Sequence, residues 1–90
     1  MSDITRDWSF GGTLRNIRVK HELTLRAAAQ KIGMDVGNLC KLEQSELSPP
    51  RSAKRVEEIV LGIGGLSSEV EFMKHLAYQH HVGALREEFG

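Results

Sequence analysis

Histidine and cysteine are the side chains in this sequence that could hold a metal ion or take part in acid–base catalysis. Three of the four histidines lie close together, at His75, His80 and His81. Positions 75 and 80 are five residues apart, which is a poor spacing for two ligands on one helical face. No cysteine or paired carboxylate completes a ligand set. We therefore expect neither a metal site nor a cofactor.

The arrangements that enzymes use for covalent catalysis or phosphate binding are also missing from the sequence. No Ser-His-Asp set, Cys-His set or phosphate-cradling glycine loop is recognisable. Gly62, Gly64 and Gly65 follow a helical pattern and are predicted to end it, rather than to open a helix after a strand. We expect no enzymatic activity, so binding is the remaining chemistry to consider.

Two short helices joined by a tight turn are predicted between Leu23 and Ser45. Thr24 precedes the first helix, about Leu25–Ile32, where its hydroxyl can accept from free backbone N–H groups. Gly33 follows that helix, and glycine can end a helix in the left-handed conformation without steric cost. Asp35 is predicted to cap the second helix, about Val36–Gln44.

The packing of these two helices also follows from the pattern of small and apolar residues. Ala28 and Ala29 are small enough to let the second helix approach closely, and Leu39 and Leu42 face inward. Helices joined by so short a turn cannot lie antiparallel and must cross steeply. The sequence therefore predicts a helix-turn-helix.

This segment resembles the helix-turn-helix of the phage repressor and Cro-like (XRE) family. The shared pattern is a small residue, a glycine, a hydrophobe, two hydrophobes in the second helix and a final glutamate, here Ala29, Gly33, Met34, Leu39, Leu42 and Glu43. The resemblance covers residues 13–64 and implies an all-α, lambda-repressor-like, five-helix DNA-binding domain. It also implies a structural ion pair between Arg18 and Glu43.

The resemblance places the second motif helix in the major groove of DNA. The base-reading positions of the family fall on Val36, Gly37 and Lys41, and Asn38 lies beside them. Lys41 can donate to guanine, Asn38 can pair with adenine, and Val36 can contact a thymine methyl group. Asp35 is interpreted as a helix cap in preference to a cytosine reader.

Phosphate contacts are expected at the borders of the motif helices. The expected residues are Arg26, Gln44, Ser45 and Arg51, together with backbone N–H groups at helix starts. The family often has a glutamine where this chain has Leu25, and Arg26 beside it can take over that contact.

The distribution of charge supports a nucleic-acid partner although the net charge is zero. Residues 13–55 hold nine Lys and Arg against four Asp and Glu, whereas residues 56–90 hold two against six. A chain that is basic on one side can dock that side on phosphates while the acidic side remains in water.

The rest of the chain is predicted from helical periodicity and capping residues. Residues 1–12 read as an N-terminal arm, 13–64 as the DNA-binding domain and 65–90 as a C-terminal helical element. The expected helices, with their starting signals, are Leu14–Glu22 after Thr13, a fourth helix from about Pro50 to Leu61, and a fifth from a Ser68–Glu71 capping box to about His81.

Homodimerisation is expected because one such motif covers only a few base pairs, and specific binding uses two half-sites. A chain of 90 residues buries only about 60% of its unfolded surface, so an added interface would help its stability. The fifth helix is the predicted dimer element, through Phe72, Met73, Leu76 and Tyr78.

Two functions remain open from the sequence. The first is a sequence-specific transcriptional regulator, most often a repressor in the XRE family, that binds double-stranded DNA. The alternative is an antitoxin or protein-interaction module that uses the same fold to hold a partner protein, such as a toxin. A cytoplasmic location is expected, because Cys40 is the single cysteine and no apolar stretch is long enough for a membrane.

Overall fold

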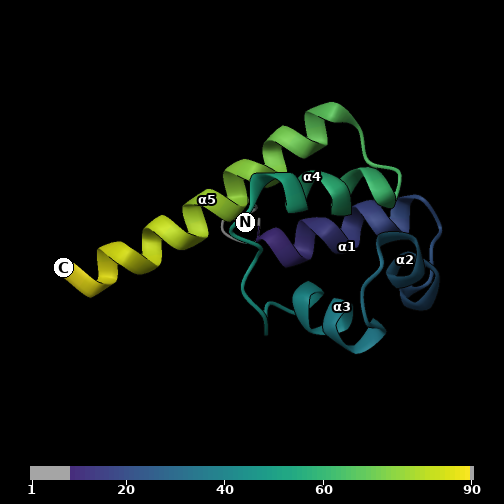
Figure 1. The fold of residues 1–90 in the computed structure, drawn as a ribbon, viewed down its shortest axis with the longest axis horizontal. Coiled ribbons are helices and arrows are strands. Elements are labelled where there is room, and N and C mark those ends of the chain that lie inside the picture. The colour runs from purple at the N-terminus through teal and green to yellow at the C-terminus, as the bar shows by residue number, and fades with distance from the viewer. Residues whose placement is uncertain (1–8, 90) are drawn as a thin grey trace, which may run out of the picture.

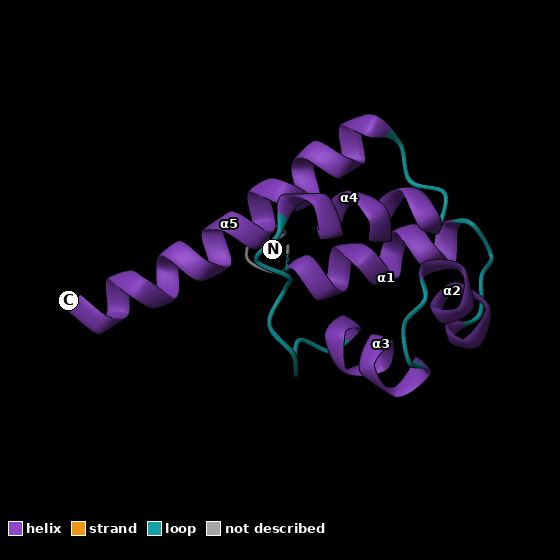
Figure 2. Ribbon diagram, viewed as in Figure 1, coloured by secondary structure: helices purple, strands orange, loops and turns teal. Residues whose placement is uncertain are grey.

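Five helices make up the regular structure of the part of the chain that this computed structural model describes, residues 9–89, with side chains described for residues 9–82 (Figure 1). They are α1 (Phe10–Lys20), α2 (Leu25–Ile32), α3 (Val36–Glu43), α4 (Ala53–Gly62) and α5 (Ser67–Phe89). No strand occurs within residues 9–89 (Figure 2). The prediction of an all-α fold is confirmed.

Core side chains come from all five helices, and α1 lies at the centre of the arrangement. It packs against α3 on one side and α5 on the other, while α4 contacts both α5 and α2. The most deeply buried side chains come from four of the helices: Leu14, Leu39, Val56, Ile59, Val60 and Met73. Burial of apolar area of this kind is the main source of stability for so small a domain.

Helix α1 begins four residues earlier than predicted, at Phe10 and not at Leu14. The Ser9 side chain caps it by accepting from the Gly12 N–H over 3.0 Å, and Phe10 is buried in the core. Gly11 was interpreted as part of an arm, but a methyl group there would lie 2.8 Å from the carbonyl oxygen of Glu43 and closer still to that of Leu42. Glycine is therefore needed where α1 meets α3. The predicted arm is thus wrong for residues 10–12, and its first eight residues lie outside the described part of the chain.

Helix α4 begins later than predicted, at Ala53, and the two prolines precede it. Ser52 is the cap, and its hydroxyl accepts from the Arg55 N–H over 3.2 Å. A hydroxyl that can accept this bond fixes the start more strongly than a proline, which only tolerates the first helical turn.

Helix α5 begins at Ser67, so the predicted capping box of Ser68 and Glu71 is wrong. The Glu69 carboxylate accepts from the Leu66 N–H over 2.7 Å and from the Lys20 ammonium over 2.9 Å. Both interactions lower the pKa of the Glu69 carboxyl group, and the hydrogen bond from the Leu66 backbone has the larger effect. One carboxylate thus caps α5 and links it to α1.

Helix α5 is also longer than predicted, because it continues beyond His81 to Phe89. Its C-terminal part extends away from the other four helices (Figure 1). Its first part lies on the domain, where Met73 is completely buried and Leu76 packs against the core. The prediction of Met73 as a dimer contact is therefore wrong, because α4 and α1 together cover that side of the helix.

The predicted ion pair between Arg18 and Glu43 is present. Arg18 Nε donates to Glu43 Oε2 over 2.6 Å and Nη2 donates to Oε1 over 3.0 Å, so the pair is bidentate. Arg18 Nη1 also donates to the Leu23 carbonyl over 2.8 Å. The side chains are only 11% and 4% exposed, and the hydrogen bond to Glu43 raises the pKa of Arg18. One guanidinium therefore joins α1, the loop after it and the end of α3.

We expect Arg18→Ala to lower the free energy of unfolding by about 3–5 kcal/mol, because it leaves the Glu43 carboxylate buried without its partner. Chemical denaturation measures this loss. Arg15→Ala is the matched control, since Arg15 is an exposed arginine on the same helix and should change stability by no more than about 0.5 kcal/mol. If the losses in Arg18→Ala and Glu43→Ala simply add in the double variant, the two side chains are not coupled.

Candidate nucleic-acid interface

The turn between α2 and α3 has the local chemistry predicted for it. The Thr24 side chain accepts from the Ala27 N–H over 3.0 Å at the start of α2. Gly33 ends α2 in the left-handed conformation, with φ +65° and ψ +40°. Residues that have a Cβ atom rarely adopt this conformation. Figure 1 shows α2 almost end-on and α3 from the side, so the two helices cross steeply. One face of α3 is thereby left free of α2.

Helix α3 has one buried side and one exposed side. Leu39, Leu42 and Glu43 are buried. The residues predicted to contact bases are all exposed, and they are Val36, Gly37, Asn38 and Lys41. The valine is 41% exposed, although its side chain is apolar. The exposed side of α3 therefore offers an ammonium group, an amide and an apolar contact to a partner.

Asp35 acts as the cap of α3. Its carboxylate accepts from the Asn38 N–H over 3.2 Å, which satisfies one of the free backbone donors at the helix start. The interpretation of this residue as a cap in preference to a base reader is therefore supported by its hydrogen bond.

The four residues predicted to contact phosphates are all exposed, and they come from three segments. Arg26 lies in the first turn of α2, Gln44 and Ser45 follow α3, and Arg51 lies just before α4. Gln44 Nε2 donates to Cys40 Sγ over 3.4 Å, which orients the amide along α3. Ser45 has a positive φ of 64°, so it occupies a backbone conformation that favours glycine.

The basic side chains divide into ion-paired and unpaired groups. Within residues 9–82, carboxylates pair with Arg18, Lys20, Arg55 and Lys74. In the same range no ion pair involves Arg15, Arg26, Lys31, Lys41, Arg51 or Lys54. Three of these six, Arg26, Lys41 and Arg51, were predicted to contact DNA. Unpaired cations are available to phosphates without the loss of an existing contact.

No group of three or more His, Cys, Asp or Glu side chains in the described residues is arranged to hold a metal ion. His81 Nε2 lies 3.0 Å from the Pro49 carbonyl oxygen, so this ring links α5 to the loop before α4. None of the helices in the described part of the chain has the length and apolar character needed to cross a membrane.

No family model, curated protein or solved structure matches this chain. The interpretation of the exposed side of α3 therefore depends on its geometry, its charge and the spacing of its residues.

We expect Asp35→Ala to lower the free energy of unfolding by about 1 kcal/mol through loss of the α3 cap. Asp35→Asn is the matched control, because an asparagine side chain can accept the same N–H and should retain most of the stability. Thermal and urea unfolding of both variants measure the difference. Equal losses in the two variants would contradict the capping role and assign the effect to the charge.

Proposed function

We propose that this protein is a sequence-specific DNA-binding transcriptional regulator of the helix-turn-helix type, with α3 as the helix that enters the major groove. The observation that carries the proposal is the exposed side of α3, on which Val36, Asn38 and Lys41 stand free of the core. A buried ion pair at the other end of that helix fixes which side faces outward. The resemblance to the phage repressor and Cro-like family supports the same assignment.

Each exposed residue of α3 has a defined use in the groove. The N-terminal half of α3 points toward the base edges in this binding mode. Lys41 donates to guanine O6 and N7, Asn38 pairs with adenine, and Val36 contacts a thymine methyl group. Gly37 presents no side chain and lets the helix approach the bases closely.

The surrounding cations supply affinity that does not depend on sequence. Arg26 and Arg51 have no ion pair within residues 9–82, and each can neutralise one phosphate. Gln44 and Ser45 add polar contacts at the end of α3. Phosphate contacts of this kind position a protein on the duplex and make its affinity depend strongly on salt.

The proposal includes a homodimer that binds an inverted repeat, and α5 remains the proposed dimer element. Of the residues predicted at the interface, Met73 belongs to the core of the single chain and Leu76 packs against that core. Phe72 is half-buried, and Tyr78 is 67% exposed. The interface is therefore centred on the outer side of α5 around Tyr78, and aromatic residues are enriched at the centres of such interfaces.

Selection of duplexes from a random pool by the full chain tests the proposal directly, because it needs no knowledge of the natural site. We expect enrichment of an inverted repeat whose half-sites lie about one helical turn apart. Enrichment of a single half-site would contradict the dimer. A pool that stays random after repeated selection would contradict sequence-specific binding and favour the protein-interaction alternative.

We expect Lys41→Ala to weaken binding to the selected site by about 1–3 kcal/mol, through loss of hydrogen bonds to one base. The fold should persist because the side chain is exposed. Competition gel shifts against the selected site and its point variants measure the change. Lys31→Ala serves as the control, since Lys31 is an exposed cation on α2. Preference that stays unchanged in Lys41→Ala would remove this face of α3 from the groove.

We expect Arg51→Ala to weaken binding to all duplexes alike. The slope of log affinity against log salt should fall by roughly 0.9, the value for one phosphate contact on B-DNA. Fluorescence anisotropy with the selected site and an unrelated duplex, over a range of salt concentrations, measures both quantities. A loss confined to the selected site would instead identify Arg51 as a base reader.

A further inference from the structure

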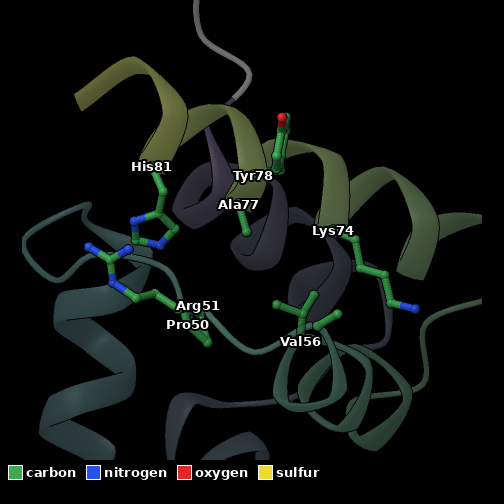
Figure 3. A pocket seen from close by; sticks show the side chains of 8 residues that line it. Pro50, Arg51, Val56, Lys74, Ala77, Tyr78 and His81 are labelled. Atoms are coloured by element: carbon green, nitrogen blue, oxygen red, sulfur yellow. The ribbon is translucent and has the colours of Figure 1, made fainter. Parts of the chain in front are cut away.

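A cavity of about 220 Å³ lies between the loop before α4, the first turn of α4 and the middle of α5 (Figure 3). Its floor is apolar, because Val56 and Ala77 are buried core residues whose side chains border it. Pro50 and Ala53 continue the apolar lining on the α4 side. Two further lining residues have roles proposed above, Arg51 at a phosphate and Tyr78 at the dimer interface. None of the roles proposed for α3 uses this cavity.

The polar side chains around the cavity are two cations, Arg51 and Lys74, and two hydrogen-bonding rings, His81 and Tyr78. Arg51 and His81 lie together at one end, and Lys74 lies at the other end with its ammonium directed outward (Figure 3). The bond between His81 and the Pro49 carbonyl holds the imidazole in place. No carboxylate lines the cavity, and within residues 9–82 no ion pair occupies Arg51. An anion is therefore the complementary ligand at this end.

The size of the cavity limits what can enter. A cavity of about 150 Å³ in another protein holds a benzene molecule, so 220 Å³ accommodates one ring and a small head group. Larger ligands need about 300–1,000 Å³. We propose that this cavity binds a small amphipathic carboxylate, with its ring on Val56 and Ala77 and its carboxylate on the Arg51 guanidinium.

Occupation of the cavity would connect ligand binding to DNA binding through a single side chain. Arg51 is the residue assigned above to a phosphate, and a bound carboxylate would take up the same guanidinium. The ligand would then weaken binding to every duplex by about the effect of one phosphate contact. This consequence, unlike the cavity itself, rests on the proposed function.

Titration of the full chain with phenylacetate, followed by the backbone amide signals of the protein, tests the ligand class. We expect saturable changes centred on Val56, Ala77 and Arg51. Acetate lacks the ring and phenylacetamide lacks the charge, so the affinity of each should be lower than that of phenylacetate by at least about tenfold. Equal binding of phenylacetamide would contradict a role for the anion, and changes that do not saturate with phenylacetate would contradict the site.

Two variants and a matched control tie the binding to this cavity. Arg51→Gln should weaken phenylacetate binding about tenfold, and Ala53→Leu should block it by filling the cavity from an exposed position. Lys54→Gln removes an exposed cation that does not line the cavity and should leave binding unchanged. An equal loss in Lys54→Gln and Arg51→Gln would assign the effect to general electrostatic attraction and overturn the proposal.

A last measurement separates the cavity from the proposed DNA function. Phenylacetate should weaken duplex binding by the wild-type chain but not by Arg51→Gln. If ligand binding is intact and duplex affinity does not change, the link through Arg51 is wrong. If the chain binds no duplex with or without ligand, the proposed function fails while the ligand site stands.

Discussion

A buried carboxylate is the constraint on which the position of α3 depends. Glu43 is the only buried polar or charged residue in the described part of the chain, and removal of a carboxylate from water is costly unless its oxygens are paired. Both oxygens accept from Arg18, and the third contact of that guanidinium reaches the Leu23 carbonyl. The carboxylate and the guanidinium are fully paired when α1 and α3 have this relative position. The pair therefore favours this position over others more than it adds to the free energy of unfolding.

The close approach of α1 and α3 is the second half of the same constraint. The backbone carbonyls of Leu42 and Glu43 occupy the space that a side chain at Gly11 would need. The ion pair and Gly11 thus act on the same two helices. The ion pair holds α1 and α3 together, and the glycine has no side chain that would keep them apart. Together they leave the opposite side of α3 exposed, and that side carries the proposed function.

The elements that the sequence predicts well are those fixed by neighbouring residues. Thr24, Gly33 and Asp35 each act on backbone groups within a few positions, so both ends of α2 and the start of α3 follow from local chemistry. The start of α1 does not, because Gly11 reads as a helix breaker until its contact with α3 is known. The role of Met73 is similar: helical periodicity shows that α5 has an apolar side, but not that both α4 and α1 cover it. The cavity beside Arg51 is formed by segments that are distant in sequence, so no local pattern predicts it.

The bond between Arg18 and Glu43 also has a consequence for how the length of this chain can vary. The two residues are 25 positions apart, and everything between them must place a guanidinium and a carboxylate within 3 Å of each other. One residue added inside α2 or α3 would rotate the following side chains by roughly 100° about the helix axis and separate the pair. The segment 44–52 lies outside this closed stretch and is mostly exposed. A change of length there would leave the ion pair in place, but it would move Arg51 and the Pro49 carbonyl that His81 contacts relative to α3. The ion pair therefore limits the length of the stretch between α1 and α3, and it places no limit on the segment that joins α3 to α4.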